Sequence, residues 1–278
     1  MKDINIVIVN YNMKDKIAVC LETLFFDLQK NNLDVCVTVV DNHSEDGSIQ
    51  FLKEKFPQVN YIEQEKNFGF GKSQNKGIKH CEAKYYFILN PDTIFHKEKN
   101  TIQKLFDFME NNPKIGMIGT KLVYPDGSLQ YSCWRYPSFF QPFFQRTKLG
   151  KTKWGKKKID HHHMKDFDHN NTIPVDAIMG SSMFVRKEAV DDAGMFDERY
   201  FMYYEDIDWS MSMWEKGWPV YYVHDIVLTH IHGRGSAEVP GVFKALFKNK
   251  LARIHVQSWL KFLWKWRGKQ KYYAIKYK

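Results

Sequence analysis

The stretch DINIVIVNYN, residues 3–12, determines the fold class because it joins a buried strand to polar residues at its end. Residues 4–9 form an apolar, β-branched run of the kind that builds a strand covered on both faces. Asn10 and Asn12 follow this run directly. Apolar residues then recur at helical spacing, at Ile17, Cys20, Leu21, Leu24, Phe25 and Leu28. The chain therefore begins with a strand, a polar turn and a helix.

The same unit repeats along the first hundred residues. Further strands are predicted at residues 35–40, 59–62 and 85–89, and helices at residues 48–56, 71–80 and 102–109. Strands and helices that alternate over short connections favour a doubly wound, mostly parallel α/β sheet. We expect this half of the chain to be a Rossmann-like nucleotide-binding unit.

The second half of the chain has a less regular pattern. A hairpin is predicted at residues 121–131, because Asp126-Gly127 separates two short runs. Residues 136–172 are rich in lysine, histidine and aromatic residues without a clear period, so we expect a mobile loop there. The remaining predictions are strands at residues 175–186 and 220–223, and helices at residues 187–193, 206–216 and 243–266.

Size and composition indicate a globular protein with one main domain. The chain has 278 residues, of which 44% are hydrophobic, and this is enough for a sizeable core. We expect a domain over residues 1–235 and a basic, aromatic, helical segment over residues 236–278. No apolar run reaches the roughly 18 residues of a membrane-spanning helix. The apolar start is too short for a signal peptide, so the protein is predicted to be cytoplasmic.

The charge of +9 is concentrated in two places, residues 148–158 and residues 244–278. A basic surplus attracts polyanions and acidic lipid headgroups. In the second segment the basic residues alternate with aromatic ones, which suits a membrane interface. A helix packed on the main domain with a solvated basic face is the alternative. We find no nucleic-acid motif and expect no nucleic-acid partner.

The four cysteines, Cys20, Cys36, Cys81 and Cys133, lie far apart and form no CxxC pair. This spacing favours free thiols over a disulfide framework or a zinc site. The triplet at residues 161–163 is a run of histidines in lysine-rich surroundings, and we assign it no role.

Polar residues stand at the carboxyl ends of three predicted strands. Asn10 and Asn12 follow the first strand, Asp41 the second and Asp92 the fourth. Ligands of open α/β sheets bind beyond these ends. Asp92, within Asn90-Pro91-Asp92, is a candidate ligand for Mg²⁺, which takes one or two carboxylates plus substrate phosphates. Polar turns and helix caps are the alternative explanation for the same residues.

Three further segments carry candidate chemistry. Residues 67–77 form a glycine-rich turn before a helix, where backbone amides can approach a phosphate; an ordinary turn is the alternative. Glu205 and Asp206 begin a predicted helix, where acids serve either as a general base or as favourable charges at the helix N-terminus. His230 follows a strand, and it either ligates a metal or satisfies a local hydrogen bond.

Taken together and in order, these segments resemble the family 2 glycosyltransferases, specifically the rhamnosyltransferase-like branch. The resemblance spans residues 4–235 and rests on residues 6–12, 40–42, 67–71, 90–92, 194–198, 201–208, 217–218 and 230. It implies a GT-A fold and inverting transfer of a sugar, such as rhamnose, from a nucleoside diphosphate sugar (dTDP- or UDP-linked). The acceptor would be a glycan or a lipid-linked sugar in cell-surface polysaccharide synthesis.

The resemblance also implies roles for individual residues. Asn10, Asn12 and Asp41 would hold the nucleoside, and Asn67, Gly69, Gly71 and Asn75 would lie beside the donor. Asp92 and His230 would bind Mg²⁺ or Mn²⁺. Asp206 would be the general base, with Glu205 beside it. The basic C-terminal segment would hold the enzyme at the inner face of the cell membrane.

Two departures from the family pattern stand out. The DxD motif is reduced to Asn90-Pro91-Asp92, and Ser212 stands where many relatives carry arginine. Both changes affect contacts to the donor or the acceptor, so a degenerate homologue that binds membranes or polyanions is one alternative. A sugar-phosphate nucleotidyltransferase is another, although the chain lacks a basic glycine-rich signature near its N-terminus.

Overall fold

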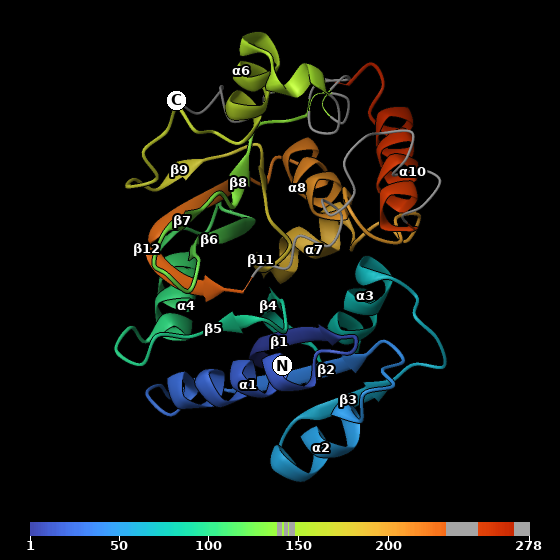
Figure 1. The fold of residues 1–278 in the computed structure, drawn as a ribbon. Coiled ribbons are helices and arrows are strands. Elements are labelled where there is room, and N and C mark those ends of the chain that lie inside the picture. The colour runs from blue at the N-terminus through green and yellow to red at the C-terminus, as the bar shows by residue number, and fades with distance from the viewer. Residues whose placement is uncertain (138–140, 142–143, 145–147, 232–249, 270–278) are drawn as a thin grey trace.

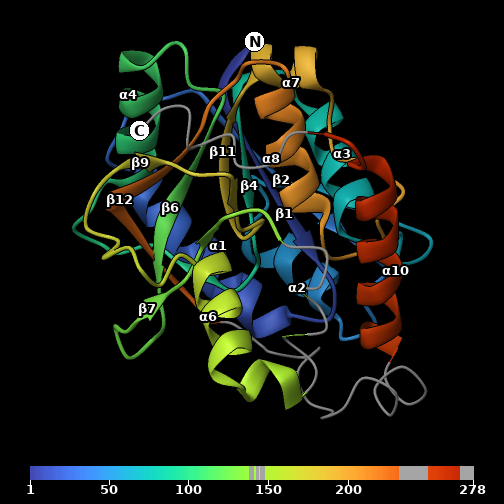
Figure 2. The ribbon, with the colours of Figure 1, turned by 90° about the horizontal axis from the view of Figure 1, so that it is seen from above.

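The computed structural model describes residues 1–137, 141, 144, 148–231 and 250–269. Its main feature is a ten-stranded sheet with the order β3-β2-β1-β4-β11-β6-β12-β5, in which β7 and β9 pair at the side. Helices cover both faces of this sheet (Figure 1), and Figure 2 shows the same arrangement from above.

The first half of the chain forms the parallel part of the sheet, as predicted. Its strands are β1 (Lys2–Asn10), β2 (Val35–Asp41), β3 (Asn60–Glu63) and β4 (Ala83–Leu89). The connecting helices are α1 (Lys14–Leu28), α2 (Ser48–Lys55) and α3 (Phe70–His80). Because Asn10 pairs with Asp41 in the register of β1 and β2, the two polar ends lie side by side.

Side chains of β1 alternate between two cores. Ile4, Ile6 and Ile8 are buried in one core with residues of α1 and α4 (Thr101–Asn111). Val7 and Val9 belong to the other core, together with residues of α7 (Lys187–Ala193), α8 (Glu205–Glu215) and α10 (Lys250–Lys265). A strand covered on both faces explains the apolar run of residues 6–9. Asn5, the polar residue within the strand, is buried and donates hydrogen bonds to the carbonyl oxygens of Gly77 and Cys81.

The second half adds strands of mixed direction. Strand β11 (Ser182–Arg186) runs antiparallel to both β4 and β6 (Met117–Val123), and β12 (Val220–His230) runs parallel to β6. The predicted hairpin is present, because β7 (Leu129–Gln130) pairs antiparallel with β6. The remaining strands are β5 (Thr93–Ile94), β8 (Cys133–Trp134), β9 (Ile173–Pro174) and β10 (Ala177–Ile178).

Strand β12 is longer than the predicted 220–223. A register shift between Val223 and Val227 lets it continue along β6, and its last residue, His230, pairs with Thr93 of β5. The extension carries His230 to the edge where the parallel strands end. The strand predicted at residues 175–186 is interrupted at Gly180-Ser181, which lie between β10 and β11.

The expectation of a mobile loop over residues 136–172 is wrong for the part that the structure describes. A 3₁₀ turn (Lys148–Lys151) leads into α6 (Lys153–His162). The Oγ1 atom of Thr152 caps α6 by accepting a hydrogen bond from the Gly155 amide at 3.1 Å. His162 Nδ1 lies 2.5 Å from the Arg135 carbonyl oxygen and ties the end of α6 to the domain.

The C-terminal helix α10 packs on the main domain. Trp259, Phe262 and Trp266 are buried, and Lys265 Nζ lies 2.7 Å from Oδ2 of Asp208 in α8. Residues 243–249 of the predicted helix lie outside the described residues. Other side chains of the same helix remain exposed to solvent: Leu260 is 54% exposed and Trp264 is 67% exposed.

All four cysteines are free thiols, as predicted, and Cys20, Cys36 and Cys133 are buried. Within the described residues, none of the helices combines the length and apolar character needed to cross a membrane.

Candidate functional site

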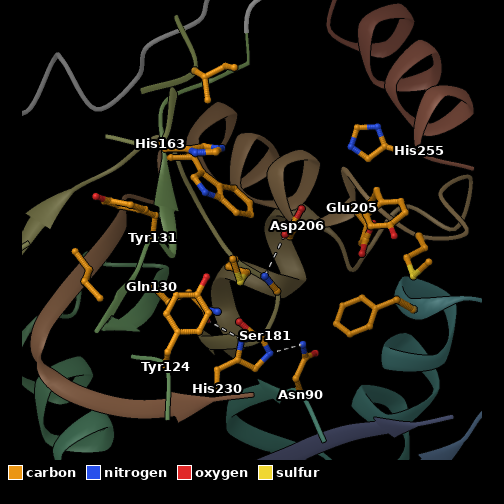
Figure 3. A pocket seen from close by; sticks show the side chains of 18 of the residues that line it. Asn90, Tyr124, Gln130, Tyr131, His163, Ser181, Glu205, Asp206, His230 and His255 are labelled. Atoms are coloured by element: carbon orange, nitrogen blue, oxygen red, sulfur yellow. Dashed lines mark hydrogen bonds between the residues drawn. The ribbon is translucent and has the colours of Figure 1, made fainter. Parts of the chain in front are cut away.

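A cavity of about 730 Å³ opens where the carboxyl ends of the parallel strands meet the start of α8. Figure 3 shows side chains from distant parts of the chain pointing into it. Its polar lining includes Asn90, Gln130, His163, Glu205, Asp206, His230 and His255. The sequence placed Glu205, Asp206 and His230 in one site, and the structure brings these three together.

Asp92 and His230 form a close pair beside this cavity. The Asp92 Oδ1 atom lies 3.1 Å from His230 Nε2, and both side chains are almost completely buried. Asn90 Nδ2 lies 3.3 Å from the same imidazole nitrogen, and Lys16 Nζ lies 3.8 Å from Asp92 Oδ2. The pairing of β12 with β5 produces this contact, because β5 directly follows Asp92.

Gln130 fixes the orientation of the imidazole ring. Its Oε1 atom lies 2.7 Å from His230 Nδ1, on the side of the ring away from Asp92. When Nδ1 carries the ring proton, it donates a hydrogen bond to Gln130. Nε2 is then unprotonated, and its lone pair can bind a metal ion. Gln130 was not among the predicted site residues, and its position depends on the hairpin of β6 and β7.

The Asp92–His230 pair fits a divalent cation. Two ligands at right angles on a cation, with bonds of about 2.1 Å, stand about 3 Å apart, close to the observed 3.1 Å. Among the described residues no group of three or more histidine, cysteine or acidic side chains could hold a metal. A cation here would therefore take its remaining ligands from a substrate or from water, and a carboxylate with an imidazole suits Mn²⁺ better than Mg²⁺.

Asp206 lines the cavity at the start of α8. Its Oδ2 accepts a hydrogen bond from the Gly180 amide at 3.1 Å, and its Oδ1 accepts one from the Ile207 amide at 2.8 Å. Burial raises the pKa of Asp206 to about 6, and the two backbone amides limit that rise. A carboxylate with this pKa is ionised at neutral pH and can still accept a proton readily.

Glu205 differs from its neighbour in how it is held. Its Oε2 is buried without a hydrogen-bond partner among the described residues. Burial raises the pKa of Glu205 well above its ordinary value, and the nearby charge of Asp206 raises it further. Of the two adjacent acids, Asp206 therefore carries the negative charge and Glu205 holds a proton.

The backbone before α8 is strained. Tyr203 and Tyr204 both have positive φ, 71° and 69°, a conformation that costs non-glycine residues about 1–3 kcal/mol each. Phe201, just upstream, accepts a hydrogen bond from the Phe70 amide at 2.8 Å. This turn sets where α8 begins and therefore where Glu205 and Asp206 point.

Asp208 is an acid of the same helix that does not line the cavity. It accepts hydrogen bonds from Trp266 Nε1 at 2.7 Å and from the Tyr200 hydroxyl at 3.0 Å, in addition to its ion pair with Lys265. Burial raises the pKa of Asp208, and Lys265 and the hydrogen bonds oppose that rise. Asp208 therefore anchors α10 to the helix that carries Asp206.

The residues predicted to hold a nucleoside form a separate network outside the cavity lining. Asn10 Nδ2 donates to Asp41 Oδ1 at 2.9 Å and to Ser48 Oγ at 2.8 Å, while Asp41 Oδ2 accepts the Ser44 amide at 2.9 Å. Asn12 is exposed, and its Oδ1 accepts the Glu45 amide at 2.8 Å. These hydrogen bonds connect the polar ends of β1 and β2 into one network at the carboxyl edge of the parallel strands.

Asn42, which was not among the predicted site residues, joins that edge to the glycine-rich turn. Its Oδ1 accepts hydrogen bonds from the Phe68 amide at 2.9 Å and Gln64 Nε2 at 2.9 Å. Its Nδ2 donates to Asn67 Oδ1 at 2.8 Å. The predicted donor-binding turn is therefore fixed to the residue that follows Asp41.

Close contacts require glycine at Gly69 and leave little room for a side chain at Gly71. Gly69 has a φ of 88°, and a Cβ atom there would lie 2.1 Å from the Phe201 carbonyl oxygen. A Cβ on Gly71 would lie 3.1 Å from Phe196 Cβ. Asn75, also predicted beside the donor, exchanges hydrogen bonds with the Phe196 backbone at 2.8 and 3.0 Å.

The outer wall of the cavity comes from residues that were not among the predicted site residues. His163 and Lys165 line it from the end of α6, and His255 lines it from α10. Burial lowers the pKa of His163 to about 4, so this imidazole is neutral at pH 7. Ser212 is absent from the lining, and its hydroxyl donates to the Asp208 carbonyl oxygen at 3.0 Å.

Comparison with known sequences gives one family. The sequence model described as "Glycosyl transferase family 2" matches residues 5–170. The N-acetylglucosaminyl-diphospho-decaprenol L-rhamnosyltransferase of Mycobacterium tuberculosis is 27% identical over 225 residues, which cover 74% of this chain and 69% of that protein. The rhamnosyltransferase WbbL of Escherichia coli (strain K12) is 26% identical over 274 residues, 93% of this chain and 91% of the relative.

Comparison with solved structures agrees on the fold. A structure of GalNAc-T7 with UDP, GalNAc and Mn²⁺ resembles this chain with a TM-score of 0.64 at 13% identity. The match covers 96% of this chain and 48% of that one, so the chain spans about half the length of that protein. The predicted α/β fold of the GT-A type is confirmed.

Proposed function

The chain belongs to glycosyl transferase family 2, and from this premise we propose that it moves a hexose, rhamnose in the first instance, with inversion from a nucleoside diphosphate sugar to a lipid-linked or glycan acceptor. One observation carries the proposal. The ionised Asp206 and the Asp92–His230 pair stand around one cavity, although they come from three distant parts of the chain. This arrangement suits a reaction that needs a base on one side and a bound diphosphate on the other.

Asp206 is the proposed general base. Its carboxylate lines the cavity, and two backbone amides hold it in place without neutralising it. It would take the proton of the acceptor hydroxyl as that oxygen attacks the anomeric carbon. Attack from the face opposite the leaving diphosphate gives inversion. Glu205, which holds a proton, would keep the neighbourhood of Asp206 free of a second negative charge.

Asp92 and His230 are the proposed ligands of Mn²⁺ or Mg²⁺. A divalent cation there would neutralise the charge that develops on the diphosphate leaving group. Gln130 would hold His230 in the tautomer that presents Nε2, and Lys16 would add positive charge beside Asp92.

The donor nucleoside is proposed to lie over the edge that Asn10, Asn12 and Asp41 build, next to the turn that contains Asn67, Gly69 and Gly71. Asn75 would act through the Phe196 backbone, to which it is hydrogen-bonded. The nucleotide is proposed to be dTDP or UDP.

We propose residues 1–235 as the catalytic domain and residues 236–278 as the segment that meets the cytoplasmic face of the membrane, where a lipid-linked acceptor is found. The mycobacterial relative is named for a decaprenol-linked acceptor, which supports this choice. The exposed Leu260 and Trp264 on α10 support it as well.

The experiment is a thermal-shift screen of dTDP- and UDP-sugars, with and without Mn²⁺, followed by a transfer assay with a polyprenyl diphosphate-linked sugar. A ligand that binds the folded state raises its stability by mass action, so the true donor should raise the melting temperature more when Mn²⁺ is present. Donor binding without transfer to any acceptor would favour a degenerate homologue. Formation of a nucleoside diphosphate sugar and pyrophosphate, in a parallel reaction supplied with a nucleoside triphosphate and a sugar 1-phosphate, would favour the nucleotidyltransferase alternative.

A further inference from the structure

The large apolar side chains that stand furthest out of the described surface are concentrated on two helical segments. After the N-terminal Met1, the four most exposed are Trp264 (67%), Trp154 (58%), Leu260 (54%) and Leu149 (53%). Trp264 and Leu260 belong to α10, whereas Leu149 and Trp154 belong to the 3₁₀ turn and α6. Aromatic side chains exposed to this degree are typical of surfaces that contact another phase or molecule.

Both segments are rich in basic residues, and each includes a long stretch without aspartate or glutamate. Residues 148–158 contain six lysines and no aspartate or glutamate, and Lys151, Lys153, Lys156, Lys157 and Lys158 are exposed. Residues 239–278 also contain no acidic residue. The exposed residues of α10 include Lys250, Arg253 and Lys261, and Arg267 is exposed just beyond its end. Exposed tryptophan and leucine among basic residues complement a bilayer with anionic headgroups.

The two segments flank the mouth of the candidate active site. His163 at the end of α6 and His255 on α10 both line the cavity, and Figure 3 shows them above Asp206. In Figure 1 both helices lie on the side of the sheet away from α1 and α2. A surface that contacts both helices would therefore lie against the cavity opening.

Resting on the proposed transfer to a lipid-linked acceptor, we infer that Leu149 and Trp154 on the α6 segment form a second membrane contact beside that of α10. The two contacts together turn the cavity opening toward an anionic bilayer. A lipid-linked acceptor then reaches Asp206 without leaving the membrane surface. The partner is the anionic bilayer itself, recognised by interfacial aromatic insertion and by lysine–headgroup attraction.

The experiment measures sedimentation of the full chain with vesicles of phosphatidylcholine alone or with added phosphatidylglycerol. The variant L149E/W154E leaves α10 intact and should reduce the partition coefficient on anionic vesicles by at least about tenfold, since it removes two interfacial side chains and adds two negative charges. The matched control is Phe26→Glu on α1. Phe26 is 39% exposed and lies near Lys30 and Lys97, so it offers the same chemistry on the opposite side of the sheet.

Unchanged binding of F26E together with the loss in L149E/W154E supports the inference, provided that circular dichroism shows both variants folded. Binding of L149E/W154E equal to wild type overturns it, and so does an equal loss in F26E, which would point to overall charge alone. Wild-type binding to heparin with no preference for anionic vesicles would also overturn it, in favour of a soluble polyanion. Donor-induced thermal shift of L149E/W154E tests the transferase proposal separately, because this measurement needs no membrane.

Discussion

Substitution of Asp206 by asparagine should remove activity and stabilise the protein at the same time. Burial raises the pKa of Asp206 from 3.8 to about 6, which at 1.36 kcal/mol per pKa unit corresponds to about 3 kcal/mol of destabilisation by the ionised form. A carboxyl whose folded pKa is raised costs nothing below pH 4 and its full amount above pH 6. The cost is therefore present at pH 7, where the enzyme is expected to work.

Asparagine removes this charge but keeps only one acceptor oxygen for the amides of Gly180 and Ile207. The lost hydrogen bond costs about 1 kcal/mol. The net gain at pH 7 is then about 2 kcal/mol, which for a chain of this size raises the melting temperature by roughly 4 °C. The transfer rate should fall by about 10²–10⁴-fold, the usual contribution of a general base.

The two effects are measured by calorimetry at pH 7 and pH 4.5 and by a radiolabelled transfer assay at saturating donor. Stabilisation should be clear at pH 7 and smaller at pH 4.5, because the wild-type carboxyl is then protonated. Donor-induced thermal shift should persist and show that the site is intact. A D206N protein that transfers sugar at the wild-type rate, or that is less stable at pH 7, would refute the reasoning.

Other perturbations give equally direct readouts. The value of kcat/KM should rise with pH through an apparent pKa of about 6, because Asp206 must lose its proton to act as a base; a rate that is flat from pH 5 to pH 8 would exclude this role. His230→Gln should weaken Mn²⁺-dependent donor binding by about 10–100-fold with little change in stability without metal, measured by calorimetric titration. Gly69→Ala should cost roughly 2–4 kcal/mol in urea unfolding, because its Cβ would meet the Phe201 carbonyl oxygen. Asp27→Ala should cost about 2 kcal/mol in the same assay, since both Asp27 oxygens accept amides at the start of α4; a wild-type denaturation midpoint in either variant would contradict the packing described.

Much of the parallel half of the fold could be predicted from the sequence, because its buried strands β1, β2 and β4 are mostly apolar and are each followed by polar residues. Asn10, Asp41 and Asp92 lie at one edge of the sheet for that reason. The helix that begins with Glu205 and Asp206 was also predicted, at residues 206–216, and lies at Glu205–Glu215 in the structure. The prediction that they share a site with His230, which lies further along the chain, came from the family resemblance.

The α6 region could not be predicted, because its helix depends on contacts outside itself. Within α6 only Gly155 and His162 are buried, so there is no apolar stripe to give a helical period. The helix is held by the Thr152 cap and by the bond between His162 and the Arg135 carbonyl oxygen. The sequence likewise could not reveal Gln130 or Asn42, whose roles come from strand pairing and from side-chain contacts across loops.

The packing of α10 changes how its membrane role is best tested. Deletion of the C-terminal segment would remove the Lys265 and Trp266 partners of Asp208 and expose the helix that carries Asp206. Loss of function in such a deletion would mix folding with membrane contact. Substitution of the exposed Leu260 and Trp264 by glutamate keeps the packed face and isolates the outer one.

The most direct measurement is a crystal structure of the chain with Mn²⁺ and a nucleoside diphosphate, with the metal located by anomalous scattering. The account predicts one Mn²⁺ peak within bonding distance, about 2.1–2.2 Å, of both Asp92 and His230, with diphosphate oxygens completing the site and Asp206 facing the cavity beyond. A metal and diphosphate bound away from this pair, or on a surface that Asp206 does not face, would contradict it.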